Sequence, residues 1–248
     1  VGRRTRVNSD KVVVVMGAGD ATGGAVAERF AREGYIACVS RRNPDKLEPL
    51  VGRIEAAGGR AVAFGTDARR EEQVQEMFRT VEEDIGPVEV CVFNIGGNVR
   101  FLINETTTRV YYKVWEMGCF AGFLTGREAA HYMKPRGRGT ILFTGATASV
   151  RGGIGYSAFA GAKFGLRALA QSMARELGPE GIHVAHVVID GAIDTKWIEK
   201  MFPEVYARKD QDGILNPHEI AEVYWQLHCQ KSSAWTQEAD LRPWIEPH

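Results

Sequence analysis

The stretch KVVVVMGAGDATGG, residues 11–24, decides the fold. It opens with a run of β-branched residues that ends in Met16 and Gly17, which predicts a buried strand. The residues that follow, GGAVAERFAREG at 23–34, have the apolar spacing of a helix and close on Gly34. A glycine-rich turn therefore joins a buried strand to a helix.

The same alternation of strand and helix continues along the chain. Strand-like runs lie at 35–40, 60–67, 88–94, 139–145 and 182–190, and helical stretches lie at 45–57, 70–84, 106–134 and 157–177. Near-continuous apolar strands that alternate with helices are typical of a parallel sheet covered on both faces. No linker or repeat divides the chain. We therefore expect an α/β fold with one doubly wound domain, residues 11–248, and a mostly parallel seven-stranded sheet.

The bulk composition is that of an ordinary globular protein. With 248 residues, of which 44% are hydrophobic and 25% charged, the chain has enough apolar material for one core. Lys plus Arg and Asp plus Glu both number 31, and this balance argues against a broad surface for nucleic acid or membrane. The exception is residues 1–10, where Arg3, Arg4 and Arg6 form a basic arm that we expect to be a flexible terminus.

The cysteines predict a reducing compartment. Four cysteines show no metal spacing, and Cys38 and Cys91 fall in apolar strand-like runs, so we expect buried free thiols and no metal site. No apolar run reaches 18 residues, and no signal-peptide pattern opens the chain. These features favour a cytoplasmic protein with no membrane partner.

The turn at 17–24 is a candidate phosphate-binding site. A glycine-rich turn at this place lets the backbone approach a pyrophosphate, whose charge then lies against the amides of the helix N-terminus. The alternative is a tight turn that holds no ligand. The candidate ligand-binding residues in it are Gly17, Gly19, Asp20, Thr22 and Gly23.

From about residue 10 to residue 230 the chain resembles the short-chain dehydrogenase/reductase family. That family usually has Thr-Gly-x-x-x-Gly-x-Gly at the first turn, where this chain has Met16 for the threonine, Ala21 for the middle glycine and Gly23 for the next one. The resemblance implies a Rossmann-type domain that binds a nicotinamide dinucleotide. It further implies cofactor contacts at Asp67, Ala68, Asn94, Gly96, Lys163, Gly191, Ile193 and Thr195.

The segment SRRNPDK, residues 40–46, predicts which dinucleotide is bound. A binder of NAD(H) usually places a carboxylate at this strand end to hold the ribose 2′-hydroxyl. Here Arg41 and Arg42 stand in its place, and guanidinium groups suit a 2′-phosphate. The alternative is a pair of solvated arginines in a surface loop. We expect NADP(H) as the cofactor, with NAD(H) less favoured.

The stretch GYSAFAGAK, residues 155–163, carries one member of the resembled family's Asn-Ser-Tyr-Lys catalytic set. In that family the tyrosine is the general acid/base, the lysine lowers the tyrosine pKa and holds the nicotinamide ribose, the serine orients the substrate and the asparagine supports a water chain. Lys163 matches the lysine, but Phe159 stands at the tyrosine position. Ala146 stands at the serine position and Gly118 at the asparagine position. The resemblance thus implies that cofactor binding is retained and the usual proton donor is lost, a loss of roughly 10²–10⁴-fold.

Three functions fit this pattern. The first is an NADP(H)-dependent oxidoreductase that moves a hydride to or from a small apolar carbonyl, alcohol or enoyl substrate with a relocated proton donor. Tyr156 and Lys163 have the Tyr-x₆-Lys spacing of enoyl-thioester reductases, so Tyr156 is a candidate donor, although it could equally pack over the pocket mouth. Asp190 is a second candidate, a carboxylate where the family has proline. The other two functions are a non-redox cyclase or isomerase and a catalytically degraded NADP(H)-binding protein.

The last fifty residues predict the substrate side and the assembly. The region 195–215 corresponds to the family's substrate lid, and Trp197, Phe202 and Tyr206 within it suggest an apolar substrate, or rings that only pack on the sheet. Asn216 and Pro217 predict the start of a helix. The tail, residues 233–248, reads as a strand followed by a docked segment at a subunit interface. By analogy with the family, the two long helices imply a homodimer or homotetramer.

Overall fold

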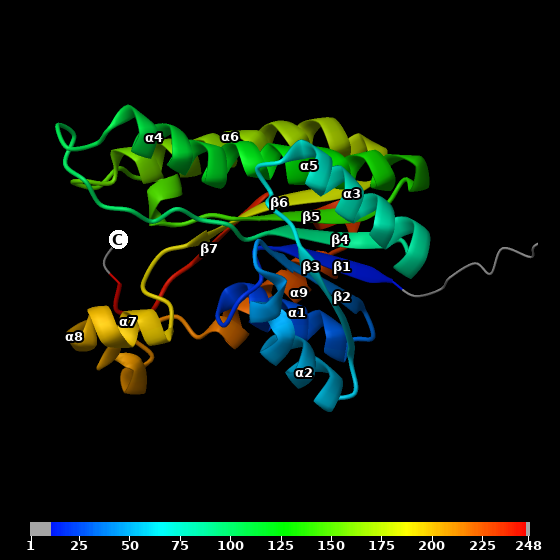
Figure 1. Cartoon of the computed structure of the whole chain (residues 1–248), viewed down its shortest axis with the longest axis horizontal. Helices are drawn as coiled ribbons and strands as arrows, with labels where there is room; N and C mark the ends of the chain where they lie inside the picture. The colour runs from blue at the N-terminus through cyan, green and yellow to red at the C-terminus, as the bar shows by residue number, and fades with distance from the viewer. Residues whose placement is uncertain (1–10, 247–248) are drawn as a thin grey trace, which may run out of the picture.

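The computed structural model describes residues 11–246, so the predicted basic arm lies outside the described residues. One sheet has the strand order β3-β2-β1-β4-β5-β6-β7, and every neighbouring pair is parallel (Figure 1). The strands are β1 (Val12–Met16), β2 (Ile36–Arg41), β3 (Arg60–Gly65), β4 (Val88–Phe93), β5 (Gly139–Thr144), β6 (Ile182–Ile189) and β7 (Glu238–Leu241). The predicted seven-stranded sheet is confirmed, and it is parallel throughout.

Helices cover both faces of the sheet. They are α1 (Thr22–Arg32), α2 (Glu48–Ala56), α3 (Glu71–Thr80), α4 (Thr108–Trp115), α5 (Ala121–Met133), α6 (Ser157–Leu177), α7 (Lys196–Met201), α8 (Pro203–Tyr206) and α9 (Pro217–His228). One face carries α3, α4, α5 and α6, and the other carries α1, α2 and α9 (Figure 1). The doubly wound architecture explains why every residue of β1 is apolar. Val12 and Val14 pack in the core on one face of the sheet, and Val13 and Val15 pack in the core on the other face.

Two of the predicted helices contain a wider turn. The expected helix at 106–134 is α4 followed by a π-helical segment, Glu116–Phe120, and then α5. The expected helix at 70–84 likewise ends in a π-helical segment, Val81–Ile85. In the first case Gly118 and Gly122 press against α6, where a β-carbon would lie 3.1 Å from Ala162 Cβ and 2.5 Å from Leu166 Cδ1. The extra residue in the π turn and these glycines set how closely the two long helices approach.

The carboxyl-terminal part forms a separate lobe beside the carboxyl ends of the strands. Here α7, α8 and the short helix Lys209–Gln211 lie away from the other helices (Figure 1). Asn216 caps α9 by accepting a hydrogen bond from His218 N at 2.9 Å, as predicted. After β7 the chain returns to this lobe, where Trp244 Nε1 donates to Gln211 O at 2.9 Å. The tail is therefore docked on the predicted lid of its own chain.

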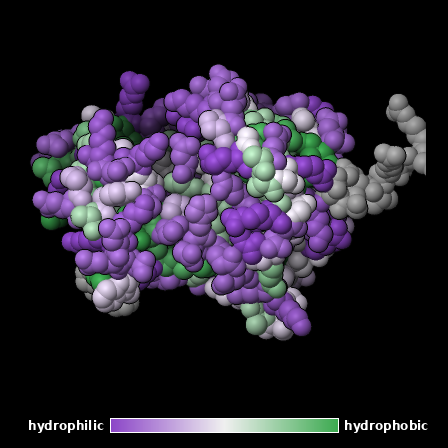
Figure 2. All heavy atoms as spheres, turned by 90° about the horizontal axis from the view of Figure 1, so that it is seen from below, coloured by the Kyte–Doolittle hydropathy of each residue, from purple (hydrophilic) through white to green (hydrophobic). Residues whose placement is uncertain are grey.

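The outer surface offers little continuous apolar area on the side of α1, α2 and α9. Seen from that side, the molecule is mostly hydrophilic with small scattered apolar patches (Figure 2). None of the helices within residues 11–246 is long and apolar enough to cross a membrane. The thiols of Cys38 and Cys91 are free and buried, as expected, and burial raises the pKa of Cys38 to about 12.

Candidate functional site

Two adjoining cavities open at the carboxyl ends of the central strands. The strand order reverses between β1 and β4, and ligands of open α/β sheets bind in the crevice at such a reversal. One cavity, of about 710 Å³, lies toward the lid, and the other, of about 520 Å³, lies toward the end of β2. Asn94, Ile95 and Gly96 line both cavities. The two form one elongated groove, a shape suited to a dinucleotide.

The glycine-rich turn is built by close backbone contacts. Gly17 has a φ of +94°, and a β-carbon there would lie 2.7 Å from Ile95 Cγ1 and 2.8 Å from Asn94 O. A β-carbon at Gly23 would lie 2.6 Å from Gly17 O. Asn94 Nδ2 donates to Gly17 O at 3.0 Å and so holds the turn against β4. The predicted residues Gly17, Gly23 and Asn94 are thus brought together.

The N-terminus of α1 is left open toward the groove. The residue before the helix is Ala21, which provides no side-chain cap, so the first amides of α1 lack that partner. The Thr22 hydroxyl is buried, lines the larger cavity and has no hydrogen-bond partner among the described residues. A pyrophosphate at this place would satisfy both the amides and the hydroxyl, so the residues fit the predicted dinucleotide.

Substitutions in the turn should separate folding from ligand binding. Gly17→Ala should lower the free energy of unfolding by more than about 2 kcal/mol, because alanine is strained at this φ and meets the backbone of Asn94. Gly19→Ala should leave stability within about 0.5 kcal/mol, because nothing lies within 4 Å of the added carbon. Since that open space is where the pyrophosphate would lie, Gly19→Ala should weaken NADPH binding about tenfold. Chemical denaturation and NADPH titration measure the two effects, and unchanged NADPH affinity in Gly19→Ala would contradict this placement.

The smaller cavity has a basic rim. Arg41, Arg42 and Lys46 line it beside the end of β2, together with Ser40, whose buried hydroxyl has no partner among the described residues. The described residues that line this cavity include one carboxylate, that of Asp67. The predicted arginine pair therefore lines the groove at the end of β2.

Asp67 forms an ion pair with Arg69, a residue that was not predicted from the sequence. Arg69 Nε donates to Asp67 Oδ1 at 2.8 Å and Arg69 Nη2 donates to Asp67 Oδ2 at 2.6 Å. These hydrogen bonds lower the pKa of Asp67 and raise that of Arg69. Both carboxylate oxygens are thus taken by Arg69, and the direct adenine contact implied for Asp67 competes with this pair. The Asp-x-Arg spacing at 67–69 is the sequence pattern that could have indicated this ion pair.

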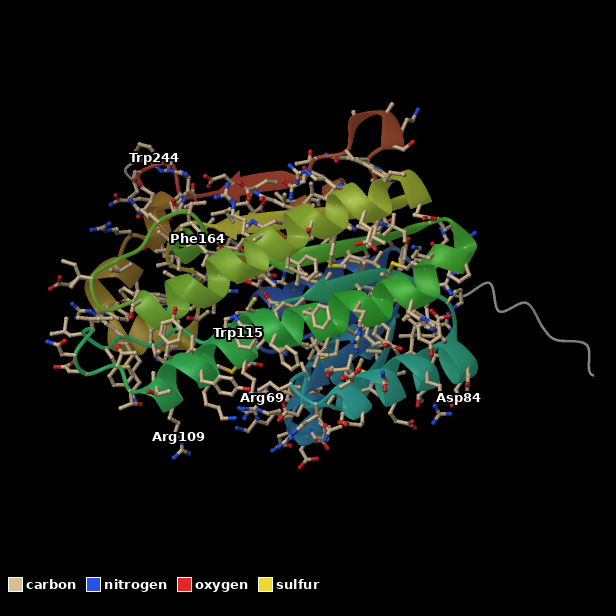
Figure 3. All side chains as sticks on the ribbon, turned by 90° about the horizontal axis from the view of Figure 1, so that it is seen from above. Arg69, Asp84, Arg109, Trp115, Phe164 and Trp244 are labelled. Carbon is tan, nitrogen blue, oxygen red and sulfur yellow. The ribbon has the colours of Figure 1, made fainter. Side chains whose placement is uncertain are left out.

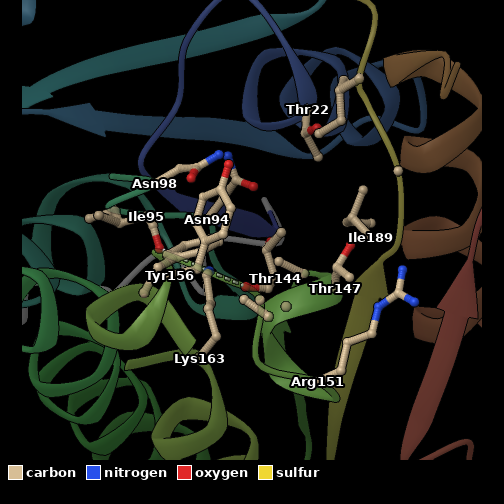
Figure 4. A pocket seen from close by; sticks show the side chains of 18 of the residues that line it. Thr22, Asn94, Ile95, Asn98, Thr144, Thr147, Arg151, Tyr156, Lys163 and Ile189 are labelled. Atoms are coloured by element: carbon tan, nitrogen blue, oxygen red, sulfur yellow. Dashed lines mark hydrogen bonds between the residues drawn. The ribbon is translucent and has the colours of Figure 1, made fainter. Parts of the chain in front are cut away.

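Lys163 lies at the centre of the groove (Figure 4). Its side chain comes from α6, and its Nζ donates to Thr144 O at 2.8 Å and to Ile95 O at 3.3 Å. Burial lowers its pKa to about 8. The ring of Phe159, one helical turn earlier, lies with its centre 6.0 Å from the ammonium. The lysine is therefore a buried cation next to an apolar ring.

The groove brings together most of the other predicted positions near Lys163. Ala146, Tyr156 and Phe159 all line the larger cavity. Gly118 does not line either cavity, because it lies in the π-helical segment and packs on Ala162 of α6. Among the lining residues, the hydroxyls nearest in sequence to Ala146 are those of Thr144 and Thr147.

Asp190, the second catalytic candidate, is buried at the end of β6. Its side chain is only 4% exposed and does not line the cavity. Thr147 donates to Asp190 Oδ1 at 2.5 Å, and Arg151 and Arg242 lie 3.8 Å and 3.4 Å from the carboxylate. The carboxylate thus contacts two side chains that line the cavity, those of Thr147 and Arg151.

A buried network that sequence reasoning did not foresee supports the loop bearing Ala146 and Thr147. His186 on β6 contacts Glu238 on β7 through Nδ1 at 3.0 Å, and Arg167 on α6 donates to the same carboxylate at 2.6 Å and 2.7 Å. Burial lowers the pKa of His186 to about 4. A β-carbon on Gly145 would lie 2.4 Å from His186 Nε2, so glycine is required there. The network fixes the start of the loop.

The last predicted cofactor positions lie where the chain leaves β6. Gly191 and Ile193 line the larger cavity, and Ile193 forms a bridge with Leu215. Thr195 accepts a hydrogen bond from Ile198 N at 3.1 Å and caps α7, so its hydroxyl serves the lid helix. Ala68 lines the smaller cavity after β3, whereas Asp20 and Gly19 of the glycine-rich turn line neither cavity. Within residues 11–246, no three His, Cys, Asp or Glu side chains gather as a metal site would require.

Comparison with known proteins identifies the family of the chain. The family described as short chain dehydrogenase matches residues 11–205. The 3-oxoacyl-[acyl-carrier-protein] reductase of Mus musculus is 32% identical over 186 residues, which cover 75% of this chain and 77% of that protein. The crystal structure of a short-chain dehydrogenase from Rhodopseudomonas palustris is 50% identical, with a TM-score of 0.81 over 94% of this chain and 99% of that one. A metagenomic short-chain oxidoreductase in complex with NADP shares the fold, with a TM-score of 0.80 at 24% identity over 95% of this chain and 98% of that one. The chain belongs to the short-chain dehydrogenase/reductase family of oxidoreductases.

Proposed function

We propose that the protein is an NADP(H)-dependent oxidoreductase that acts on a carbonyl, alcohol or enoyl group with an active site that lacks the family's usual hydroxyls. The observation that carries the proposal is the buried Lys163 ammonium, held at 2.8 Å from Thr144 O in the wall of a groove whose far end is basic. When bound, the nicotinamide ring donates or accepts the hydride. Residues of this chain then bind the substrate and move the proton.

The charge of the groove supports NADP(H). Arg41, Arg42 and Lys46 gather at the end of β2, and the one carboxylate among the described lining residues there, Asp67, is neutralised by Arg69. A 2′-phosphate has cationic partners at this end, whereas among the described lining residues no free carboxylate is present to accept a hydrogen bond from a ribose 2′-hydroxyl. The structural relative solved with NADP agrees with this assignment.

Tyr156 is the proposed proton donor. It lines the larger cavity at the start of α6, two turns before Lys163, and carries the phenol that Phe159 lacks. With Ala146 and Phe159 at the two positions where the family has hydroxyls, and Gly118 withdrawn from the cavity, Tyr156 is the acidic hydroxyl left near the lysine. Thr147, oriented by Asp190, is the proposed replacement for the substrate-orienting serine.

The wall of the cavity favours a substrate with an apolar body. Ile95, Ala148, Phe159, Ile189 and Ile193 supply apolar surface around the lysine. The lid adds two exposed rings, Trp197 in α7 (54% exposed) and Phe202 between α7 and α8 (46% exposed). Closure of the lid over the cavity would cover both rings. Because a relative of 32% identity is a 3-oxoacyl-[acyl-carrier-protein] reductase, thioesters are the first substrates to test.

Tyr156→Phe should identify the proton donor. With NADPH and a panel of 3-oxoacyl thioesters, enoyl thioesters and simple ketones, we expect NADPH oxidation by the native chain and at least about a 100-fold lower turnover in Tyr156→Phe. NADPH affinity should be unchanged, because the phenol acts on the substrate. Tyr132→Phe, near the end of α5 and outside both cavities, is the matched control and should retain turnover. Equal turnover of Tyr156→Phe and native protein would remove Tyr156 from the mechanism.

A second function rests on the missing hydroxyls. If the protein binds NADPH tightly and oxidises none of it with the panel, the loss of hydroxyls at 146 and 159 is complete and the chain binds NADP(H) without redox turnover. Such a protein would be a non-redox cyclase or isomerase, or a binding protein. Absence of NADPH binding would contradict the oxidoreductase and the binding protein, and would leave the cyclase or isomerase, which needs the pocket but no dinucleotide.

The outer face of α4, α5 and α6 supports an oligomer. Trp115 and Phe164 lie on this face (Figure 3), and Tyr111, Tyr112 and Phe123 are also large and exposed there. Trp115, Phe120 and Phe123 form a stacked row with ring centres 5.8 Å and 6.2 Å apart. We propose that two copies of the chain bury this face against each other in a dimer or tetramer.

A further inference from the structure

We propose that the guanidinium of Arg69 is a stacking platform for the adenine ring, and that Asp67 is the residue that positions it. The inference rests on the proposed NADP(H) function and deepens it, since it assigns a contact to the base. It also replaces the direct adenine contact expected of Asp67 with an indirect one.

The edge of the Arg69 guanidinium is already occupied. Nε and Nη2 form a paired contact with the two oxygens of Asp67 at 2.8 Å and 2.6 Å, and Nη1 lies 3.6 Å from Glu116 Oε2. Glu116 is in turn held by Lys113 Nζ at 2.7 Å. A guanidinium donates only along its edge, so a ligand meets its flat face.

The position of that face suits a base. The Arg69 side chain is 23% exposed and lines the smaller cavity. Ala68, Met117 and Ala121 line the same cavity with small or apolar surface and bring no charge. A planar cation beside an apolar wall forms a slot for a flat aromatic ring, and arginine commonly stacks on such rings.

The arginines that line the smaller cavity have two different roles in nucleotide binding. Arg41 and Arg42 stand at the end of β2, and among residues 11–246 their guanidinium groups have no hydrogen-bond partner, so they can bind a 2′-phosphate, whereas the donors of Arg69 face carboxylates. Arg69 therefore contributes equally to NADPH and NADH, because both carry the same adenine. Arg42 contributes to NADPH alone, because only NADPH carries the phosphate. The two residues have distinguishable signatures.

The test measures the affinities of purified variants for NADPH and for NADH by nucleotide fluorescence. Arg69→Ala should weaken both nucleotides by the same factor, about tenfold. Arg69→Lys should behave like Arg69→Ala, because it keeps the charge and loses the plane. Arg42→Ala should weaken NADPH about tenfold and leave NADH unchanged. Arg70→Ala, which removes the same charge one residue away from an exposed position, is the matched control and should change neither affinity.

Each remaining outcome contradicts the inference. Unchanged affinities in Arg69→Ala, a loss confined to NADPH, or full affinity in Arg69→Lys would show that Arg69 is not a stacking surface. If the melting temperature of Arg69→Ala is well below that of the native protein, the affinities of Arg69→Lys alone test the inference, because lysine preserves an ion pair with Asp67. If the native protein binds NADPH and these outcomes occur, only the inference falls. If the native protein binds neither nucleotide, the proposed function falls with it.

Discussion

A chain that carries both Ala146→Ser and Phe159→Tyr will reduce carbonyl substrates with NADPH at least about 100-fold faster than the native chain. The ring of Phe159 lines the larger cavity with its centre 6.0 Å from Lys163 Nζ, so a hydroxyl added to that ring enters the cavity beside a cation. A nearby positive charge favours the ionised phenol and lowers its pKa. The serine hydroxyl at position 146 adds a second contact to the substrate oxygen. The rate of NADPH oxidation with acetoacetyl-coenzyme A measures the gain.

The single variants and a lysine variant are the controls for this gain. Phe159→Tyr alone should provide most of it, because the phenol supplies the proton, and Ala146→Ser alone should provide little. Adding Lys163→Met to the double variant should remove the gain. A folded double variant that binds NADPH but is no faster than the native chain would show that positions 146 and 159 do not correspond to the family's serine and tyrosine.

Lys163→Met will lower turnover by about 100- to 1,000-fold and weaken NADPH binding, with the fold retained. The lysine is the buried cation in the wall of the larger cavity, and methionine fills a similar volume without charge. Lys134→Met, on an exposed lysine 3.6 Å from Glu180, is the matched control and should keep native turnover. Native affinity for NADPH in Lys163→Met would remove the lysine from the cofactor site.

The same variant should change how stability depends on pH. Burial lowers the pKa of Lys163 from 10.5 to about 8, so between these values the unfolded chain holds a proton that the folded chain has released. In that window the free energy of unfolding of the native protein rises with pH relative to Lys163→Met, by up to about 3 kcal/mol. Below pH 8 the burial cost is fully present and the difference is constant. Denaturation at pH 7, 9 and 10.5 checks the sign, and a difference that does not vary with pH would contradict it.

Much of the fold could be predicted from local patterns. The run at 11–17 and the later apolar strands define β1 to β6, and the helix at 157–177 is α6 as expected. The π-helical segments were not predictable, because helical periodicity does not show one extra residue in a turn. Their position depends on contacts across space, such as that between Gly118 and Ala162.

Site residues could be predicted when their role follows from their position in the chain. Gly17 and Asn94 come together because each directly follows the end of a strand on one edge of the sheet, and Gly23 joins them because it opens the helix after β1. The partners of a side chain were harder to foresee. Asp190 was a catalytic candidate from its place in the chain, but its hydrogen bond with Thr147 of another loop was not predicted. The contact of His186 with Glu238 links residues that are 52 positions apart, and no spacing rule reveals such a pair.

The docked tail gives the protein an optical reporter. Trp244 is 77% exposed, and its indole nitrogen holds Gln211 O at 2.9 Å, so one fluorophore marks the junction between tail and lid (Figure 3). Two residues earlier, Arg242 lies 3.4 Å from Asp190, the carboxylate that orients Thr147 in the cavity. Movement of the lid on ligand binding would carry this indole into a different solvent environment. In a variant that keeps Trp244 as the only one of the five tryptophans, its emission can thus time the opening and closing of the cavity without any attached dye.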